Sequence, residues 1–287
     1  MKFTAGKTTN VQQRSEKQRL LWNISAEAYA NHVKIFTTHK QITNQILACI
    51  NCIPRSILDF GCGPGNSTVL IEKNFASAEV IYSVDYSQEM ISIANNNKQP
   101  GSISRFHCVD YVDIPNIVKK PIDLIICSNS FFHVVDKSSL LDIFNEVMGD
   151  HSLLVFSLYD TVYKPSTGKI RIERNSKKDE LMEAIIIRLQ ELGYQISERQ
   201  EDRQTFTEES LNNLFSESKF EVSLNGVLCL SRDYKERLSF FRIPVVFNEV
   251  FPNVPISEIE RVFDKVNING RIPPKLSTVY IFVARRC

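Results

Sequence analysis

The stretch "SILDFGCGPGNST" places three glycines at alternate positions directly after a short apolar run. Glycine weakens regular helices and strands, so a cluster this dense usually serves a backbone conformation that side chains would block. We therefore expect a buried strand, Ser56 to Phe60, that opens into a turn at Gly61, Gly63 and Gly65. In an open parallel sheet, a turn at the carboxyl end of a strand is where a ligand lies against main chain.

Strands and helices alternate after this turn. Further strands are predicted at 78–85, 104–110, 122–130 and 151–159, with helices at 67–75, 87–97 and 137–148. This alternation predicts a mostly parallel, doubly wound sheet with helices on both faces. A sixth strand is expected at 220–230, interrupted at Gly226, and a last strand at 277–285. About 45 residues separate these two, far more than a hairpin loop needs, so an insertion with its own short helices is expected.

Composition limits the possible partners. The chain has 287 residues with 43% hydrophobic and 23% charged residues, which fits one folded α/β domain with an addition. The net charge of +1 gives no electrostatic basis for binding nucleic acid or an anionic membrane. We identify no signal peptide and no apolar run of the roughly 18–20 residues that cross a bilayer.

The seven cysteines are expected to be reduced. Their number is odd and most lie in apolar segments, so we expect a cytoplasmic protein. Cys49 and Cys52 form a C-x-x-C pair without a second pair, and we interpret them as apolar helix residues. No metal site is expected.

The glycine spacing limits the classes of ligand that the turn could bind. A dinucleotide fingerprint needs G-x-G-x-x-G, whereas here G-x-G-x-G is followed by Asn66. A phosphate-binding P-loop ends in Gly-Lys-Ser/Thr, and the turn has no lysine before Lys73. Both phosphate-binding interpretations are therefore weakened.

The segment "LDFGCGPG" resembles the first motif of the class I S-adenosylmethionine-dependent methyltransferases, and specific motifs extend the resemblance over about Leu20 to Asp160. The resemblance implies a Rossmann-like, mostly parallel seven-stranded sheet whose last strand is antiparallel, with helical cap insertions. It also implies S-adenosyl-L-methionine as the cofactor. Asp59 would then hold the methionyl ammonium, and the turn would pass beneath the amino-acid portion with Gly61, Cys62, Gly63 and Gly65.

Two further acids match the cofactor motifs of the family. Asp85 ends the second strand and would accept from both ribose hydroxyls, a geometry that a carboxylate supplies well; a helix N-cap is the alternative. Asp110 would accept from the adenine amine, with the Tyr111 amide reaching the ring; a solvated loop acid is the alternative. In the family, side chains at the positions of Tyr86 and Met90 pack on adenine.

Other matching residues would lie near the methyl group. Ser128 and Asn129 fall where the family's backbone flanks the sulfonium. His133, in "FFHVVD", could accept a proton near neutral pH, although packing behind the loop is the favoured role. Trp22 and Tyr29 match an aromatic helix that closes over the cofactor, with ordinary packing as the alternative.

These motifs predict an organisation with two cap insertions. We expect an N-terminal arm and cofactor-covering helices at 1–50, the cofactor-binding core at 51–160, cap insertions at 161–200 and 233–275, a core helix and strand at 201–232, and the final strand at 276–287. The caps would select the substrate through a largely apolar pocket, with Tyr159, Arg171 and Arg242 fixing its orientation.

The expected activity is methyl transfer from S-adenosylmethionine to an oxygen, nitrogen or carbon nucleophile. The resemblance favours a small, partly hydrophobic metabolite, as in the ubiquinone and secondary-metabolite branch. Because the sulfonium methyl is already electrophilic, such a protein mainly aligns the nucleophile and excludes water. The alternatives are a catalytically silent methyltransferase-like binding subunit, a protein or carrier-bound substrate, and aminopropyl transfer, which needs an acid cluster that does not stand out here.

Overall fold

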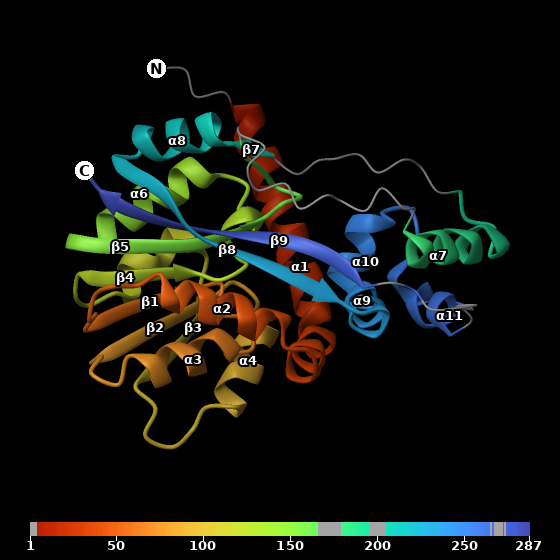
Figure 1. Ribbon diagram of the computed structural model, residues 1–287, viewed down its shortest axis with the longest axis horizontal. Coiled ribbons are helices and arrows are strands. Elements are labelled where there is room, and N and C mark those ends of the chain that lie inside the picture. Colours follow the sequence, from red (N-terminus) through yellow and green to blue (C-terminus); the bar gives the residue numbers. More distant parts are fainter. Residues whose placement is uncertain (1–4, 166–178, 196–204, 265, 267–271, 273) are drawn as a thin grey trace.

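A seven-stranded sheet forms the centre of the computed structural model (Figure 1), which describes residues 5–165, 179–195, 205–264, 266, 272 and 274–287. Its strands lie in the order β3-β2-β1-β4-β5-β9-β8. The first five pair in parallel, while β9 is antiparallel to both β5 and β8, so β8 runs in the direction of the first five. The predicted Rossmann-like sheet with an antiparallel last strand is confirmed. The strands are β1 (Ser56–Phe60), β2 (Val80–Asp85), β3 (Ser104–Cys108), β4 (Ile122–Cys127), β5 (Met148–Tyr159), β8 (Phe220–Arg232) and β9 (Lys275–Arg286).

Helices cover both faces of the sheet. As a result, every residue of a central strand such as β1 is buried. In Figure 1, α6 (Lys137–Val147) and α8 (Glu208–Glu217) lie above the sheet, and α3 (Asn66–Asn74) and α4 (Gln88–Asn96) lie below it. Helix α2 (Thr38–Ala48), drawn at the level of β1, shares an apolar core with α3. On the α6 and α8 side, the rings of Phe156, Phe215 and Phe282 stack, with centroids 5.0 and 5.2 Å apart. A second apolar core lies on the α2 and α3 side, around Ile46, Ile71 and their neighbours.

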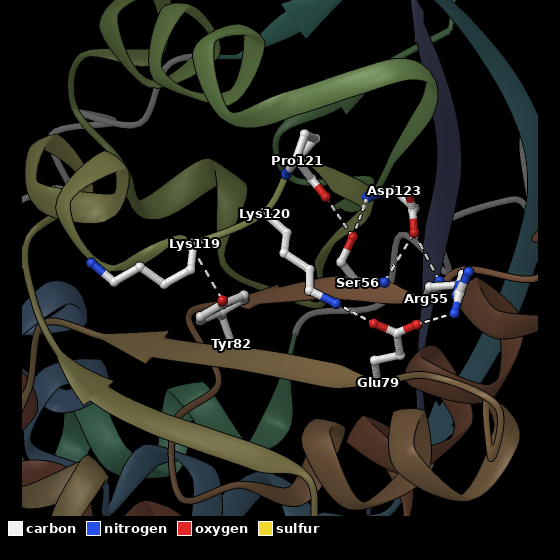
Figure 2. Close-up of polar contacts among 8 residues, drawn as sticks. All are labelled: Arg55, Ser56, Glu79, Tyr82, Lys119, Lys120, Pro121 and Asp123. Atoms are coloured by element: carbon white, nitrogen blue, oxygen red, sulfur yellow. Dashed lines mark hydrogen bonds and ion pairs between the residues drawn. The ribbon is translucent and has the colours of Figure 1, made fainter.

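Polar side chains fix the edge at which β1 and β4 begin (Figure 2). The Asp123 carboxylate accepts from the backbone amides of Arg55 and Ser56 at 2.8 and 2.9 Å. Glu79 forms ion pairs with Arg55 and Lys120 (Figure 2). The residues predicted to bind ligands, such as Asp59 and Asp85, lie at the opposite edge, where the parallel strands end.

Helix α1 (Ala5–Ile35) corrects the prediction for the N-terminus. The sequence predicts an N-terminal arm before the helices within 1–50, but the described part of this segment is helical from Ala5. Glutamine, arginine, lysine and glutamate dominate residues 12–19, and these side chains favour a helix without an apolar stripe to reveal it.

The helices outside the sheet core gather at the end of the molecule where β8 ends and β9 begins (Figure 1). They are α7 (Glu180–Glu191), α9 (Tyr234–Phe241), α10 (Pro244–Val250) and α11 (Ile259–Phe263). Their own apolar core joins Leu181 and Ile185 of α7 to Phe247 and Val262. Asp179, the N-cap of α7, also pairs with Arg237 and with Lys275 at the start of β9. Segments far apart in the sequence thus form one cap; the predicted domain boundaries remain a proposal.

Two local features refine the sequence prediction. The short strands β6 (Tyr163–Lys164) and β7 (Phe206–Thr207) pair in parallel, and Tyr163 packs on Tyr280 and Phe282 in the main core rather than in the cap. The predicted interruption of the sixth strand is confirmed, because the β8 register shifts between Leu224 and Gly226.

Candidate functional site

The glycine turn has the backbone conformation that its spacing predicts. The φ angles of Gly61, Gly63 and Gly65 are 70°, 52° and 88°, in the left-handed region that residues with a Cβ avoid. A Cβ on Gly61 would lie 2.4 Å from the Cβ of Ser130, so only glycine fits there. A Cβ on Gly63 would meet Tyr29 Cε1 at an ordinary 3.6 Å, so at that position φ is the main constraint.

Asp59, at the end of β1 and wholly buried, has one oxygen without a partner. Its Oδ2 accepts from the hydroxyls of Ser67 and Thr68 at 2.7 and 2.6 Å, whereas its Oδ1 accepts from no described residue. Burial raises the pKa of this carboxyl to about 6, against the lowering effect of the two hydroxyls. A buried acceptor left open in this way fits a cationic donor such as an ammonium.

Asp85, at the end of β2, is half-buried and keeps room for further donors. Its Oδ2 accepts from the Gly63 amide at 3.0 Å and its Oδ1 from the Ser87 amide at 2.9 Å. A carboxylate offers about four acceptor positions, so each oxygen can accept a second hydrogen bond, as from a pair of ribose hydroxyls. Burial raises the pKa of Asp85 to about 6 as well. The N-cap of α4 is Ser87, whose hydroxyl accepts from Met90, so capping is not the task of Asp85.

The remaining predicted adenine residues lie beside Asp85. Cys108, the last residue of β3, pairs with Asp85, so Asp110 and Tyr111 follow at the same edge. The predicted strand to Asp110 ends two residues early, at Cys108, and Asp110 is the N-cap of a short 3-10 helix, Tyr111–Asp113. The Tyr111 ring packs on the main core, Met90 is only 2% exposed, and Tyr86 is half-buried with a pKa raised by burial.

Helix α1 passes over the glycine turn, as the cofactor-covering role predicts. Its Asn23 accepts a 2.7 Å hydrogen bond from Ser87 at the start of α4. Tyr29 faces Gly63, and the Trp22 ring meets the rings of Tyr29 and His133 edge-on, with centroids 5.5 and 5.4 Å apart.

The end of β4 departs from the predicted strand. Cys127 is its last residue, and Asn129 has a φ of 61°, which a strand cannot contain. The backbone amide of Asn129 donates to the Ser157 hydroxyl at 3.0 Å, and the Asn129 side-chain Nδ2 lies 3.3 Å from His39 Nδ1. Burial, with smaller effects of His32 and Arg232, lowers the pKa of His39 to about 3, so its neutral ring can accept from Asn129. Ser128 is held similarly, since its hydroxyl lies 2.9 Å from that of Thr43 on α2.

Aromatic, imidazole and guanidinium side chains form a closed loop of contacts at this edge. Each touches the next and the last touches the first, in the order Trp22, Tyr29, His39, His32, Phe240, Arg232, Tyr159, Phe132 and His133. We call these residues the aromatic cluster. Of them, the sequence singled out Trp22, Tyr29, His133 and Tyr159 as site residues. Arg232 was missed because its place at the ligand edge follows from the direction of β8, which the sequence does not reveal.

The other predicted substrate residues are placed differently. Arg242 lies 4.0 Å from Glu260 and 3.9 Å from Asp264 and stacks over Phe263 in the cap, outside the aromatic cluster. Arg171 lies outside the described residues. In the part of the chain that the structure describes, no three His, Cys, Asp or Glu side chains are grouped to hold a metal. The described helices also include none that is long and apolar enough to cross a membrane.

A Rossmann-like sheet with an acid at the end of β1 and another at the end of β2, on either side of a glycine turn, defines a class of proteins that bind a nucleoside-containing cofactor. A family model described as a methyltransferase domain matches residues 55–229, more than half of the chain, and the chain belongs to this family of S-adenosylmethionine-dependent methyltransferases. S-adenosylmethionine is the cofactor of the family.

Individual relatives are similar over different lengths. The trans-aconitate 2-methyltransferase of Yersinia pestis is 46% identical over 41 residues, and the match covers 14% of this chain and 16% of that protein. Among solved structures, the YcgJ protein of Bacillus subtilis has a TM-score of 0.54 at 15% identity, covering 87% of this chain and 99% of its own. This second likeness shows the fold.

Proposed function

We propose that this protein transfers the methyl group of S-adenosylmethionine to an oxygen, nitrogen or carbon nucleophile of a small, partly hydrophobic metabolite. The observation that carries the proposal is the unpartnered, buried Oδ1 of Asp59 next to the glycine turn. A dinucleotide would bring its negative pyrophosphate against Asp59 and Asp85. S-adenosylmethionine instead brings an ammonium and neutral ribose hydroxyls, which suit two carboxylates.

The cofactor-side residues would each bind one part of S-adenosylmethionine. Asp59 accepts from the ammonium, and the turn from Gly61 through Cys62 to Gly65 leaves room for the methionyl chain. Asp85 accepts from the ribose hydroxyls. Around adenine we place the side chains that follow β2 and β3, namely Tyr86, Met90, Asp110 and Tyr111.

When bound, the cofactor supplies an electrophilic methyl group on its sulfonium. The residues after β4 would align the reacting partner, because Asn129 is fixed by Ser157 and His39 and Ser128 by Thr43. The aromatic cluster would exclude water from the methyl group. His133 lies between the rings of Trp22 and Phe132, so packing is its first role, and accepting a proton from the nucleophile is the alternative.

The cap is proposed to select the metabolite. Phe240 of α9 reaches the aromatic cluster, and α10 packs on Leu21 of α1. Tyr159 lies in the cluster, while Arg242 and Arg171 stay predictions for substrate orientation. The intact set of acids disfavours a silent binding subunit, because such a subunit would not need the open Oδ1 of Asp59.

We also propose that the protein works in the cytoplasm. All seven cysteines are free thiols, and Cys62 and Cys127 are buried. Such thiols persist in a reducing compartment.

Calorimetry with S-adenosylmethionine tests the proposal directly. The wild-type protein should bind, and Asp59→Asn should bind about 10–100-fold more weakly, a loss of roughly 1.4–3 kcal/mol, because the ammonium loses its charged acceptor. Asp142→Asn, an exposed acid on α6, is the matched control and should bind as the wild type does. Absence of binding by the wild type would refute the proposal. Mass spectrometry of a metabolite extract incubated with methyl-labelled cofactor would then identify the product.

A further inference from the structure

We propose that Arg232 anchors a carboxylate of the substrate, so that the methyl acceptor combines a negative group with an apolar or aromatic body. This inference rests on the proposed function and names the substrate class for the same site. It is carried by the position of Arg232, by the way its guanidinium is held, and by the absence of an ion pair with any described acid.

The strand directions bring Arg232 to the ligand edge. It is the last residue of β8, which runs parallel to β1–β5 and so ends at the edge where their glycine turn and acids lie. Val279 of β9 pairs with both Tyr159 and Leu228, so Arg232 extends four residues beyond the level of Tyr159. It therefore reaches past the sheet toward the cap.

The guanidinium is held by neutral groups. Its Nη2 donates to the Ser277 hydroxyl at 2.7 Å, and its Cζ lies 5.8 Å from the ring centroids of both Tyr159 and Phe240. Its Nε is buried and has no acceptor among the described residues. Two aromatic rings and one hydroxyl thus fix the plane of the guanidinium, which lowers the entropy cost of using it as a binding group.

No acid of the described residues forms an ion pair with Arg232. The cap arginines differ, since Arg237 pairs with Asp179 and Arg242 lies near Glu260 and Asp264. The buried acid of α9, Glu236, instead accepts a hydrogen bond from the Thr38 hydroxyl. A preorganised guanidinium without an ion-pair partner is the arrangement that recognises an incoming carboxylate.

Three titratable members of the aromatic cluster, His32, His39 and Tyr159, add no competing charge. Burial lowers the pKa of His32 to about 4 and that of His39 to about 3, and Arg232 contributes to both shifts. Both imidazoles are therefore neutral at pH 7. Burial raises the pKa of Tyr159, so this phenol stays protonated. A cationic substrate would meet only repulsion from Arg232, whereas an anion is attracted and its apolar body can pack on the rings.

The sheet order separates this anchor from the cofactor. Three strands, β4, β5 and β9, lie between β1 and β8, so the strands that carry Asp59 and Arg232 are roughly 19 Å apart at about 4.8 Å per step. The methionyl group beside Asp59 would place its own carboxylate at the glycine turn. Arg232 is thus assigned to the substrate rather than to the cofactor.

The test measures binding of small carboxylic acids, each compared with its own primary amide, to the protein saturated with S-adenosylhomocysteine. The panel comprises benzoic, cinnamic, salicylic and octanoic acids. Fluorescence of Trp22 reports binding, because this single tryptophan belongs to the aromatic cluster. The wild type should bind at least one acid at least tenfold more tightly than its amide. Arg232→Gln should reduce this preference to less than twofold, and Arg232→Lys should keep part of it.

The control is Arg261→Gln, an exposed cap arginine paired with Glu258, which should behave as the wild type does. The inference is overturned if no acid binds better than its amide, or if Arg232→Gln keeps the preference. It is also overturned if Arg232→Gln weakens binding of S-adenosylhomocysteine itself, since Arg232 would then serve the cofactor. Failure of the wild type to bind S-adenosylmethionine would instead refute the proposed function, so the two failures are distinguishable.

Discussion

The ligand edge of the sheet has two halves that are built from different parts of the chain. At β1 and β2, the edge consists of main chain in left-handed conformations and of acids whose partners lie within about two dozen residues, such as Asp85 and Gly63, which are 22 positions apart in the sequence. At β4, β5 and β8, it consists of side chains from distant segments. His39 meets Asn129 across 90 residues, and His32 meets Ser239 across 207.

In the proposed function, the half at β1 and β2 is the cofactor half and the half at β4, β5 and β8 is the substrate half. The cofactor half depends on backbone shape, since the positive φ angles of Gly61, Gly63 and Gly65 disfavour an added side chain. The proposed substrate half depends on which rings and charges α1, α2 and α9 bring to the edge, and most of these side chains do not touch the turn, although Tyr29 faces Gly63. Substitutions in the two halves should therefore separate cofactor binding from turnover.

The largest effect should come from Gly63→Val, which tests whether the cofactor half is made of main chain. We expect cofactor affinity to fall at least about 100-fold, because a branched side chain would occupy the space of the methionyl group and the φ of 52° disfavours it. Gly101→Val is a matched control, since Gly101 has a φ of 81° with nothing within 4 Å of its Cβ position. Calorimetry should show lost binding only for Gly63→Val; normal binding would mean that the turn is not the cofactor loop.

Asp85→Ala should weaken cofactor binding by about 10–100-fold, or roughly 1.4–3 kcal/mol, through loss of charged hydrogen bonds to two hydroxyls. At saturating cofactor, turnover should recover most of its wild-type rate, because Asp85 belongs to the cofactor half. Titration calorimetry on the folded variant measures this. Unchanged affinity would remove Asp85 from the ribose role.

Phe240→Ala should show the reverse pattern. It removes the ring that lies against Arg232 and His32, so we expect kcat/KM to fall about tenfold while cofactor affinity changes less than about threefold. Ile187→Ala, an exposed apolar residue of α7, serves as the control. A parallel loss of cofactor binding in Phe240→Ala would show that the two halves are not separable.

The smallest effect concerns pH. The pKa values of Asp59 and Asp85 are raised to about 6, so both carboxyls gain protons as the pH falls through 6 and lose their attraction for the ammonium and hydroxyls. Cofactor affinity should fall about two- to threefold between pH 7 and pH 6.

The stability of the protein without cofactor should depend on pH in the opposite direction. The folded state binds more protons than the unfolded state between pH 4 and 6, so these groups make stability decrease as the pH rises through that window. Thermal shifts with and without cofactor measure both; identical shifts at pH 6 and pH 7 would contradict the linkage.

Much of the fold and of the cofactor half could be predicted from local sequence signals. The glycine spacing predicted the left-handed turn, the helix predicted at 87–97 is present as α4 with Ser87 as its N-cap, and Gly226 marked the shift in β8. The acids Asp59 and Asp85 could be placed because strand ends are readable from apolar runs. Their roles toward the cofactor stay predictions.

The substrate half was not readable in the same way. Arg232 gains its position from the direction of β8, which depends on pairing with β9 more than 40 residues later. His32 and His39 look like ordinary helix residues until α1 and α2 are folded against β4 and α9. Asn129 was expected within a strand, and only its contacts with Ser157 and His39 account for its left-handed backbone.

Helix α1 touches both halves at once. Its Asn23 bonds to Ser87 beside the ribose acid, its Ser25 accepts from Val245 in the cap, and its Trp22 and Tyr29 belong to the aromatic cluster. Because one helix contacts both halves, we expect binding of the cofactor and of the methyl acceptor to be cooperative. Thermodynamic reciprocity then requires that the factor by which the cofactor tightens the acceptor equals the factor by which the acceptor tightens the cofactor.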